Sequence, residues 1–453
     1  MSKFDLSTVS AAALARRYRE GTLTPKEATD WFLDRIETAT DRAIFITVTA
    51  ERARREAAAS TARYRAGAPL GPLDGVPVAW KDLFDLEGTV TTAGSDIYRA
   101  TLPARADAAV VRNLAERGMV SLGKVNLSEF AYSGLGLNPH FGTPRNPFDA
   151  KIHRTPGGSS SGSAVAVAAG LAPVAIGTDT GGSVRIPSAF NGLVGFKTAE
   201  GSIDKAGVFA LSPTLDTVGP LARTVEDCLL LYSALRGDAP TDAKAASFAD
   251  IRLVVPTNIV FDGAEDAVIA NFHALLEKLG RKGARIVERA VGVLDAVQAT
   301  AVHGNITAAE AYFTHRALID SADIARVDPR VVARMMRGAG MSAYDLLALH
   351  AARTDLQKKL RADLDGALLA FPTVPHVAPE VAPLEADVEL FHAVNLKTLR
   401  NTMLGNFLDL PGFALPSGTD ASGLPTSFLL SAPSGSEAQL FAASLAVESA
   451  ARQ

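Results

Sequence analysis

Two glycine-rich segments carry the serine residues that could do chemistry. The first, residues 156–163, reads Pro-Gly-Gly-Ser-Ser-Ser-Gly-Ser, and a run of small apolar residues begins directly after it at Ala164. Serines among glycines disfavour both a strand and a helix interior, so a flexible linker is the simplest interpretation. A glycine-serine loop that opens a buried helix is, however, typical of a place where the backbone approaches another group closely.

The second segment, residues 177–187, reads Gly-Thr-Asp-Thr-Gly-Gly-Ser-Val-Arg-Ile-Pro. Consecutive glycines allow successive N–H groups to point into one concavity, which can bind an oxyanion and stabilise a tetrahedral intermediate. Ser183 closes this concavity, at the position that a nucleophile would occupy. An ordinary turn between a strand and a helix explains the same letters equally well.

A third candidate is Lys81, which directly follows the apolar run at residues 76–80. A lysine in such a place is usually a solvated strand end or one half of an ion pair. Burial without a partner would instead lower its pKa by several units, and a neutral amine can act as a general base. No single residue of the three segments decides between these interpretations.

The N-terminal part of the chain has the pattern of a helical scaffold. Thr24 and Glu27 have the spacing of a capping box, with Pro25 at the first helical position. Apolar residues then follow at helical spacing, and a second helix is predicted over residues 51–64. No residue of these helices points to chemistry.

Strands and helices alternate through the part of the chain that carries the serines and Lys81. Apolar runs at residues 76–80 and 119–122 predict strands, and residues 109–117 between them predict a helix. This alternation favours an α/β fold with a largely parallel sheet that helices cover on both faces.

The length of 453 residues allows one large domain or two, and we predict a single domain in four parts. These parts are the helical scaffold at 1–69, the core at 70–235, a variable and mainly helical region at 236–365, and the segment 366–453, whose strands at 366–372 and 412–416 return to the sheet.

The composition excludes several classes of function. A net charge of −4 provides no basic surface for nucleic acid or anionic lipid. Cys228 is the only cysteine, which excludes an internal disulfide and a cysteine metal cluster and favours the reducing cytoplasm. The apolar run at 164–177 is broken by Gly170 and Pro173 and falls short of the roughly 18 residues that a membrane span needs. The N-terminal residues lack the pattern of a signal peptide.

Taken together, these segments resemble the amidase signature family. The similarity is strong from about residue 71 to 235 and weaker from about 366 to 430. It rests on DGVPVAWKDLFD around Lys81, NLSEFAYSG, FGTPRNP, the joined glycine-serine stretch of residues 156–187, LDTVGPLARTVED, and the later LLAFPTVP, DLPGFALPSG and GLPTSF. The resemblance implies a single α/β domain with a central mixed, mostly parallel twisted sheet covered by helices on both faces. It also implies an amidohydrolase that acts on small molecules with water and without a metal or cofactor.

By the same resemblance, Ser183 is the nucleophile, Ser159 relays a proton and neutral Lys81 is the general base. A cis peptide bond typically precedes the relay serine in this family. Ser183 would form an acyl-enzyme that water then cleaves. The oxyanion would be held by the backbone N–H groups of Thr180, Gly181, Gly182 and Ser183.

Further motif residues take supporting roles in this resemblance. Ala131 and Tyr132 are expected near the acyl pocket, although a core position explains Tyr132 equally well, and Gly158 is expected to contact substrate. Asp179 and Arg185 are expected to support the serine loop by hydrogen bonds. The helical region 265–365 would shape the leaving-group side. It contains four polar residues at roughly helical spacing that fit a mixed helix face better than a site, namely His303, Glu310, Tyr312 and His315.

Three positions depart from the family pattern without removing a member of the implied triad. Ser161 stands in place of a glycine, Ser188 in place of an alanine and Leu429 in place of a glutamine. Small amides, ureides and carbamates are all cleaved within the family, and a modest ester activity is expected. A homodimer is the assembly that the family suggests.

A serine hydrolase of another fold is the strongest rival hypothesis. Residues 158–162 fit the G-x-S-x-G nucleophile elbow, with Ser160 as the nucleophile. Histidines that could complete such a triad follow in the chain at His303, His315, His350, His376 and His392. This hypothesis leaves the Ser183 segment and Lys81 unexplained.

Three further chemistries fit the sequence less well. Ser121 and Lys124 have the Ser-x-x-Lys spacing, but the companion motifs are absent. Residues 118–125 nearly match a phosphate-binding loop, yet Val125 stands where a magnesium-binding Ser or Thr should be. Cys228 precedes three leucines, which indicates a buried helix rather than a nucleophile.

A rival from a different class is the amidotransferase subunit of a tRNA-dependent transamidation complex. That subunit belongs to the same family and works only with partner chains. Residues 197–200, Lys-Thr-Ala-Glu, depart from its usual K-P-T, which favours a free-standing hydrolase. Activity without a partner or tRNA would separate the two.

Overall fold

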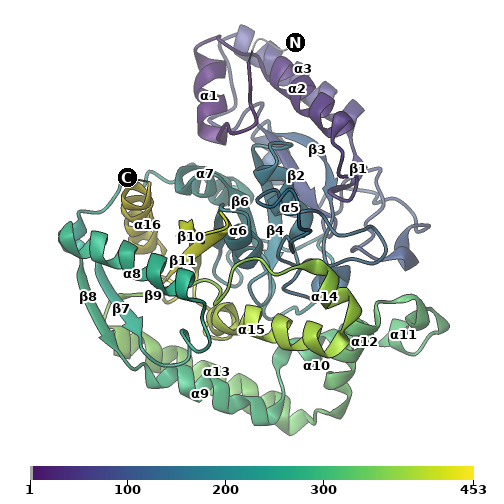
Figure 1. Cartoon of the computed structure of the whole chain (residues 1–453). Helices are drawn as coiled ribbons and strands as arrows, with labels where there is room; N and C mark the ends of the chain where they lie inside the picture. The colour runs from purple at the N-terminus through teal and green to yellow at the C-terminus, as the bar shows by residue number, and fades with distance from the viewer. Residues whose placement is uncertain (1–3, 453) are drawn as a thin grey trace.

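Eleven strands form a single mixed sheet in the computed structural model, which describes residues 4–452 (Figure 1). The strands are β1 (Phe45–Val48), β2 (Pro77–Lys81), β3 (Val120–Val125), β4 (Val174–Asp179), β5 (Val194–Lys197), β6 (Thr217–Ala222), β7 (Arg252–Pro256), β8 (Arg285–Arg289), β9 (Leu368–Pro372), β10 (Gly412–Thr419) and β11 (Pro425–Ser431). They follow the order β1-β3-β2-β4-β6-β5-β10-β11-β9-β7-β8 across the sheet. All four predicted parts of the chain contribute strands, and the predicted single α/β domain is confirmed.

The predicted predominance of parallel strands is wrong. Only the β3–β2, β2–β4, β9–β7 and β7–β8 neighbours run parallel, and the other neighbouring pairs run antiparallel. The connections between β5 and β6 and between β10 and β11 contain no helix. A connection without a crossover helix returns the chain antiparallel to its own strand. The parallel pattern therefore holds only towards the two ends of the sheet.

The sheet is flanked by α-helices and short 3₁₀ turns. The α-helices are α1 (Ala11–Arg19), α2 (Pro25–Thr38), α3 (Ala50–Arg65), α4 (Ala109–Glu116), α5 (Ser161–Ala168), α6 (Arg185–Phe190), α7 (Val225–Leu235), α8 (Asp266–Arg281), α9 (Gly292–Ala299), α10 (Ile306–Thr314), α11 (Arg316–Ile319), α12 (Pro329–Met336), α13 (Ala343–Leu364), α14 (Val381–Ala386), α15 (Val388–Phe407) and α16 (Glu437–Ala451). The 3₁₀ helices are η1 (Asp96–Tyr98), η2 (Glu129–Ala131), η3 (Phe248–Asp250), η4 (Thr300–His303), η5 (Ala322–Arg326) and η6 (Arg337–Gly340). Among residues 4–452, no helix combines the length and the apolar character needed to cross a bilayer.

Alternation along β11 shows that helices cover both faces of the sheet. Phe428 stacks on Phe272 of α8, with ring centroids 4.9 Å apart. The next residue, Leu429, points to the opposite face and packs in a cluster with Leu404 of α15 and Leu360 of α13. Both residues are fully buried, so the sheet is the centre of the core.

Several predicted elements appear with small shifts at their ends. The capping box is present, because the Thr24 side chain accepts from the Glu27 N–H and the Glu27 side chain accepts from the Thr24 N–H. Lys81 is the last residue of β2 rather than the residue after the strand. Strands β5, β6, β7 and β11 were not predicted, nor were the two edge strands, β1 and β8. Neither has a fully buried run, and β8 (Arg-Ile-Val-Glu-Arg) is largely exposed, so the apolar signal of a strand is weak there.

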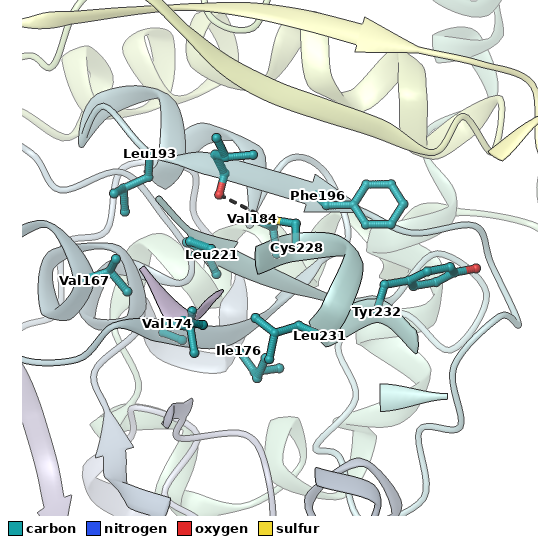
Figure 2. Packing of buried hydrophobic residues seen from close by; sticks show 14 of the residues in the cluster. Val167, Val174, Ile176, Val184, Leu193, Phe196, Leu221, Cys228, Leu231 and Tyr232 are labelled. Atoms are coloured by element: carbon teal, nitrogen blue, oxygen red, sulfur yellow. Dashed lines mark hydrogen bonds between the residues drawn. The ribbon is translucent and has the colours of Figure 1, made fainter. Parts of the chain in front are cut away.

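The elements that carry the serine segments lie in the middle of the molecule. In Figure 1, α5, β4 and α6 lie between the N-terminal helices α1–α3 at one end and the helices α9–α13 at the other. Figure 2 shows Cys228 of α7 among apolar side chains of this core. Its thiol donates to the Val194 carbonyl at 3.8 Å. Burial raises the pKa of the Cys228 thiol well above its ordinary value, so the structure agrees that this residue is core.

Candidate active site

Lys81 ends β2 inside the sheet, between β3 and β4, and its side chain is fully buried. The Nζ atom donates hydrogen bonds to Ser159 Oγ at 2.7 Å and to Thr178 Oγ1 at 2.8 Å. Burial lowers the pKa of Lys81 to about 7, although the negative charges of Asp216 and Asp179 oppose this shift. A large fraction of the amine is therefore neutral near pH 7, as a general base requires.

Ser159 lies in the loop directly before α5, and the peptide bond that precedes it, Gly158–Ser159, is cis. The neighbouring Ser160 N–H donates to the Ser183 carbonyl at 3.3 Å, which places the two serine segments side by side. One helix, α5, and one strand, β4, separate the segments in the chain. Because this connecting segment is short, the chain returns to the loop of Ser159 when it reaches Ser183.

The loop that carries Ser183 is organised by Asp179 at the end of β4. The Asp179 carboxylate accepts hydrogen bonds from the backbone N–H groups of Gly182 and Val184, at 2.8 and 3.1 Å. It also accepts from the Arg185 guanidinium at 3.0 and 2.9 Å and from the Asn406 side chain at 2.8 Å. Burial alone would raise the pKa of Asp179, but Arg185 outweighs burial and holds that pKa well below its usual range. The Asp179–Arg185 ion pair therefore holds the conformation of the loop through charged hydrogen bonds.

These contacts change the set of N–H groups that can meet an oxyanion. Because the Gly182 N–H is bonded to Asp179, it is not directed at substrate, contrary to the prediction. The hydrogen bonds of the described residues leave the N–H groups of Thr180, Gly181 and Ser183 without a protein acceptor. Gly182 has φ +131°, and a Cβ there would lie 2.2 Å from Thr402 Oγ1, so only glycine fits this turn.

A pocket opens beside this loop and reaches Ser183. The loop and η2 contribute Thr180, Gly181, Ser183, Ala131, Tyr132 and Ser133, and the other walls are formed by Leu211, Leu215, Asn305, Ile306, Thr307, Arg334, Leu399, Met403, Asn406 and Phe407. Ala131 and Tyr132 thus line the pocket that contains Ser183, and their contact with the acyl group of a substrate stays a prediction. Gly158 does not line this pocket, because its α-carbon is packed against Gly136 and Ser133, where an added Cβ would lie within 2.7 Å of backbone atoms.

Arg334 is a pocket residue that the sequence alone did not indicate. It extends from α12, and its Cζ lies 4.5 Å from the centroid of the Tyr132 ring. Burial is the largest cause that lowers the pKa of Arg334, and the charge of Arg337 adds to it, yet an arginine keeps its proton at neutral pH. No carboxylate in the described part of the chain forms an ion pair with Arg334, whereas its neighbour Arg330 is paired with Asp328 at 2.6 Å. No motif surrounds Arg334, so only the packing of α12 against the pocket could have revealed it.

The environment of Lys81 predicts how activity depends on pH. Its pKa of about 7 means that the amine is protonated below neutrality and cannot accept a proton, whereas above neutrality it is free to do so. We therefore expect kcat/KM to rise as pH increases through about 7 and then to level off. Initial rates measured from about pH 5 to about pH 9.5 would test this, and a flat profile would contradict the role of Lys81 as the base.

The structure does not support the nucleophile-elbow hypothesis. Ser160 is fully buried, and its hydroxyl donates to the Thr178 carbonyl at 3.3 Å instead of facing the pocket. The histidines that follow Ser160 in the chain contact residues outside the pocket or lie away from it. His376 bonds to Thr398, and His315 packs against the rings of Phe130 and Phe209. Among residues 4–452, no histidine lines the pocket.

The Ser-x-x-Lys hypothesis also fails on geometry. Ser121 and Lys124 of β3 form no hydrogen bond with each other, because each side chain has another partner. Lys124 is instead buried in an ion pair with Asp82 at 2.6 Å, and the Ser121 hydroxyl accepts from the Trp80 indole at 3.1 Å. Both residues are structural.

The four polar residues considered for the 265–365 region, His303, Glu310, Tyr312 and His315, lie outside the pocket, which fits a mixed helix face. His303 contacts Asp345 at 3.0 Å, and Tyr312 pairs with Arg316. Glu310 accepts a hydrogen bond from Ser212, in the loop that forms one pocket wall. Among the described residues, no group of three or more His, Cys, Asp or Glu side chains is arranged to hold a metal ion.

The three departures from the family pattern are accommodated by packing. Leu429 fills the apolar cluster under α15, and the Ser188 hydroxyl faces the α-carbon of Gly195, where a Cβ would lie 2.3 Å away. The Ser161 and Ser188 hydroxyls are both buried without a hydrogen-bond partner among the described residues. None of the three contacts the pocket.

Known proteins resemble this chain both in sequence and in structure. A family model described as amidase matches residues 27–441. The chain is 35% identical to a 2-amino-5-chloromuconic acid deaminase of Comamonas testosteroni over 88% of this chain and 86% of the relative. It is 34% identical to a glutamyl-tRNA(Gln) amidotransferase subunit of Salinispora arenicola over 98% of both. A crystal structure described as an amidase superimposes with a TM-score of 0.86 and 30% identity, over 97% of this chain and 99% of that one.

Proposed function

The chain belongs to the amidase signature family, and from this premise we propose that it is a free-standing hydrolase of small amide-type C–N bonds. The bond belongs to an amide, ureide or carbamate rather than to a peptide, and water is the only co-substrate. One observation carries the proposal: the buried Lys81 amine donates to Ser159 beside the segment that presents Ser183 to a pocket.

The proposed reaction uses residues of this chain alone. Neutral Lys81 takes a proton from Ser159, Ser159 takes one from Ser183, and the Ser183 oxygen bonds to the substrate carbonyl. The N–H groups of Thr180, Gly181 and Ser183 hold the oxyanion. The proton returns through Ser159 to the leaving nitrogen as the C–N bond breaks, and water then cleaves the acyl-Ser183 ester by the same relay in reverse.

We further propose that the substrate carries a carboxylate. Arg334 places a positive charge that has no ion-pair partner among the described residues in the wall of the pocket that contains Ser183, and Arg337 adds a second positive charge nearby. A guanidinium that contacts Tyr132 but no carboxylate is suited to two parallel hydrogen bonds with a carboxylate of the substrate. The name of the Comamonas testosteroni relative, which refers to an acid, is consistent with such a substrate.

Replacing Arg334 with glutamine is expected to separate acidic from neutral substrates. Hydrogen bonds between charged groups contribute about 1.5–3 kcal/mol, so kcat/KM for a carboxylate-bearing amide should fall about 10- to 150-fold in Arg334→Gln. The corresponding neutral amide should change little. Arg337→Gln is the matched control, because Arg337 is close to Arg334 but does not line the pocket. Equal losses on acidic and neutral substrates would mean that Arg334 shapes the pocket and does not recognise the carboxylate.

The direct test of the function is the release of ammonia or amine by the purified chain without any partner. The panel should contain amides, ureides, carbamates and esters, each as a carboxylate-bearing compound and as its neutral analogue. Turnover of any C–N substrate supports the free-standing hydrolase, and the panel then identifies the class. Complete inactivity on the panel would remove that proposal.

Amide transfer within a larger complex is the second candidate function. The observation in its favour is the similarity to the glutamyl-tRNA(Gln) amidotransferase chain of Salinispora arenicola over 98% of both proteins. A chain with that role would show activity only when partner chains and a charged tRNA are added. Hydrolysis by the chain alone, at a rate that partners do not raise, would decide against it.

A further inference from the structure

Asp216 is a buried carboxylate that joins the Ser183 loop to a wall of the pocket. It lies directly before β6, and its Oδ1 accepts from the Thr180 hydroxyl at 2.5 Å. Its Oδ2 accepts from the backbone N–H groups of Leu211 and Ser212, at 2.9 and 3.0 Å. Thr180 and Leu211 both line the pocket, so one side chain sets their separation.

The same carboxylate lies across β4 from β2, on the face of the sheet that carries the Lys81 amine. Lys81 donates to Thr178, and Asp216 accepts from Thr180, two residues further along the chain. Residues two apart in an extended segment point to the same side. Asp216 and Asp179 are the two acids whose charges favour the protonated form of Lys81.

Asp216 differs from Asp179 in how its charge is compensated. The Asp179 carboxylate is paired with Arg185 at 2.9 Å, whereas Asp216 forms no ion pair among the described residues. Lys205 stabilises the Asp216 charge, and its Nζ donates to the Asp216 backbone carbonyl at 3.0 Å. Burial raises the pKa of Asp216, and the hydrogen bonds from Thr180, Ser212 and Leu211 act against that rise.

We propose that Asp216 is a positioning residue for the reaction, which holds the Thr180 N–H at the oxyanion site and sets the protonation of Lys81 through its charge. The inference rests on the proposed function, since it assigns Asp216 a role towards the general base and the oxyanion site of that reaction. Asp216 touches neither the substrate nor the reacting atoms. Its two effects come from a hydrogen bond and from a charge, so they can be separated by substitution.

Two substitutions separate these effects. Asp216→Asn removes the charge and keeps the size of the side chain. The rise of the rate with pH near neutrality, which is the acid limb of the pH profile, should therefore move to lower pH by about half a unit or more, and the rate at the plateau should be lower. Thr180→Val removes the hydrogen bond and keeps the charge, so the plateau should fall about tenfold while the limb stays in place. Glu310→Gln is the control, because Glu310 holds the same loop through Ser212 but does not contribute to the electrostatics of Lys81.

The measurement is the rate of covalent labelling by a fluorophosphonate probe between about pH 5 and about pH 9.5, which requires no knowledge of the substrate. The Ser183 oxygen bonds to phosphorus, the P–F bond breaks, fluoride leaves, and the serine proton passes through Ser159 to Lys81. Mass spectrometry identifies the labelled residue. A label on another residue overturns the proposed function itself. If the label is on Ser183, the charge effect is overturned when the acid limb of the labelling rate in Asp216→Asn stays at the wild-type pH, or when Glu310→Gln shifts it equally. The positioning effect is overturned when Thr180→Val labels at the wild-type plateau rate.

Discussion

Ser183→Ala is expected to abolish hydrolysis, with a loss in kcat of at least about 10⁴-fold. The substitution removes the only serine hydroxyl of the 177–187 segment that lines the pocket and leaves the Asp179–Arg185 support in place. Binding is expected to persist, because the pocket walls are unchanged. Release of amine or ammonia from a turned-over panel substrate, measured with equal amounts of folded protein, would show the loss.

The matched control for this substitution is Ser160→Ala. Ser160 is as deeply buried and lies one residue from Ser159, but its hydroxyl donates to the Thr178 carbonyl and does not reach the pocket. We expect Ser160→Ala to keep activity within about tenfold of the wild type, since it loses one neutral hydrogen bond of about 1 kcal/mol. The reverse result, an active Ser183→Ala and an inactive Ser160→Ala, would make Ser160 the nucleophile.

Lys81→Met is expected to cause the second largest loss. Methionine fills a similar volume but cannot accept a proton, so kcat should fall by about 10²- to 10⁴-fold and the dependence on pH near 7 should disappear. The thermal midpoint of unfolding is not expected to fall much, because the substitution also removes the cost of burying an amine. The pH profile of the residual activity, together with a melting curve, would test both statements.

A second buried lysine provides the control for Lys81→Met. Burial lowers the pKa of Lys197 to about 8, but its amine donates to the Thr198 carbonyl and lies 3.7 Å from Asp409, without contact to either serine segment. Lys197→Met should therefore retain the acid limb near pH 7. If Lys197→Met removed that limb and Lys81→Met kept it, the proton acceptor would be Lys197.

The local features of this protein were predictable from the sequence, because they depend on residues close together in the chain. The capping box of Thr24 and Glu27 involves one helical turn, and the structure forms it as predicted. The glycine-rich segments place Ser159 and Ser183 at the ends of one helix-strand excursion, and the strand before Lys81 carries that lysine into the sheet. The family motifs likewise predicted a mixed α/β sheet in a single domain, which the structure confirms.

The remaining features depend on contacts between distant parts of the chain. The direction of neighbouring strands was decided by which connections lack a crossover helix, so the parallel prediction was wrong for most pairs. The Gly182 N–H was removed from the predicted oxyanion set by one hydrogen bond to Asp179.

Arg334 and Asp216 show most directly what the tertiary structure alone decides. Arg334 stands out only because α12 brings it to the pocket without an acidic partner in the part of the chain that the structure describes. Asp216 is significant because its position directly before β6 places its carboxylate against Thr180, on the face of the sheet that carries the Lys81 amine. A sequence specifies which groups can ionise or donate, but burial and the nearest charges determine their pKa values and partners, and both arise only when the chain has folded.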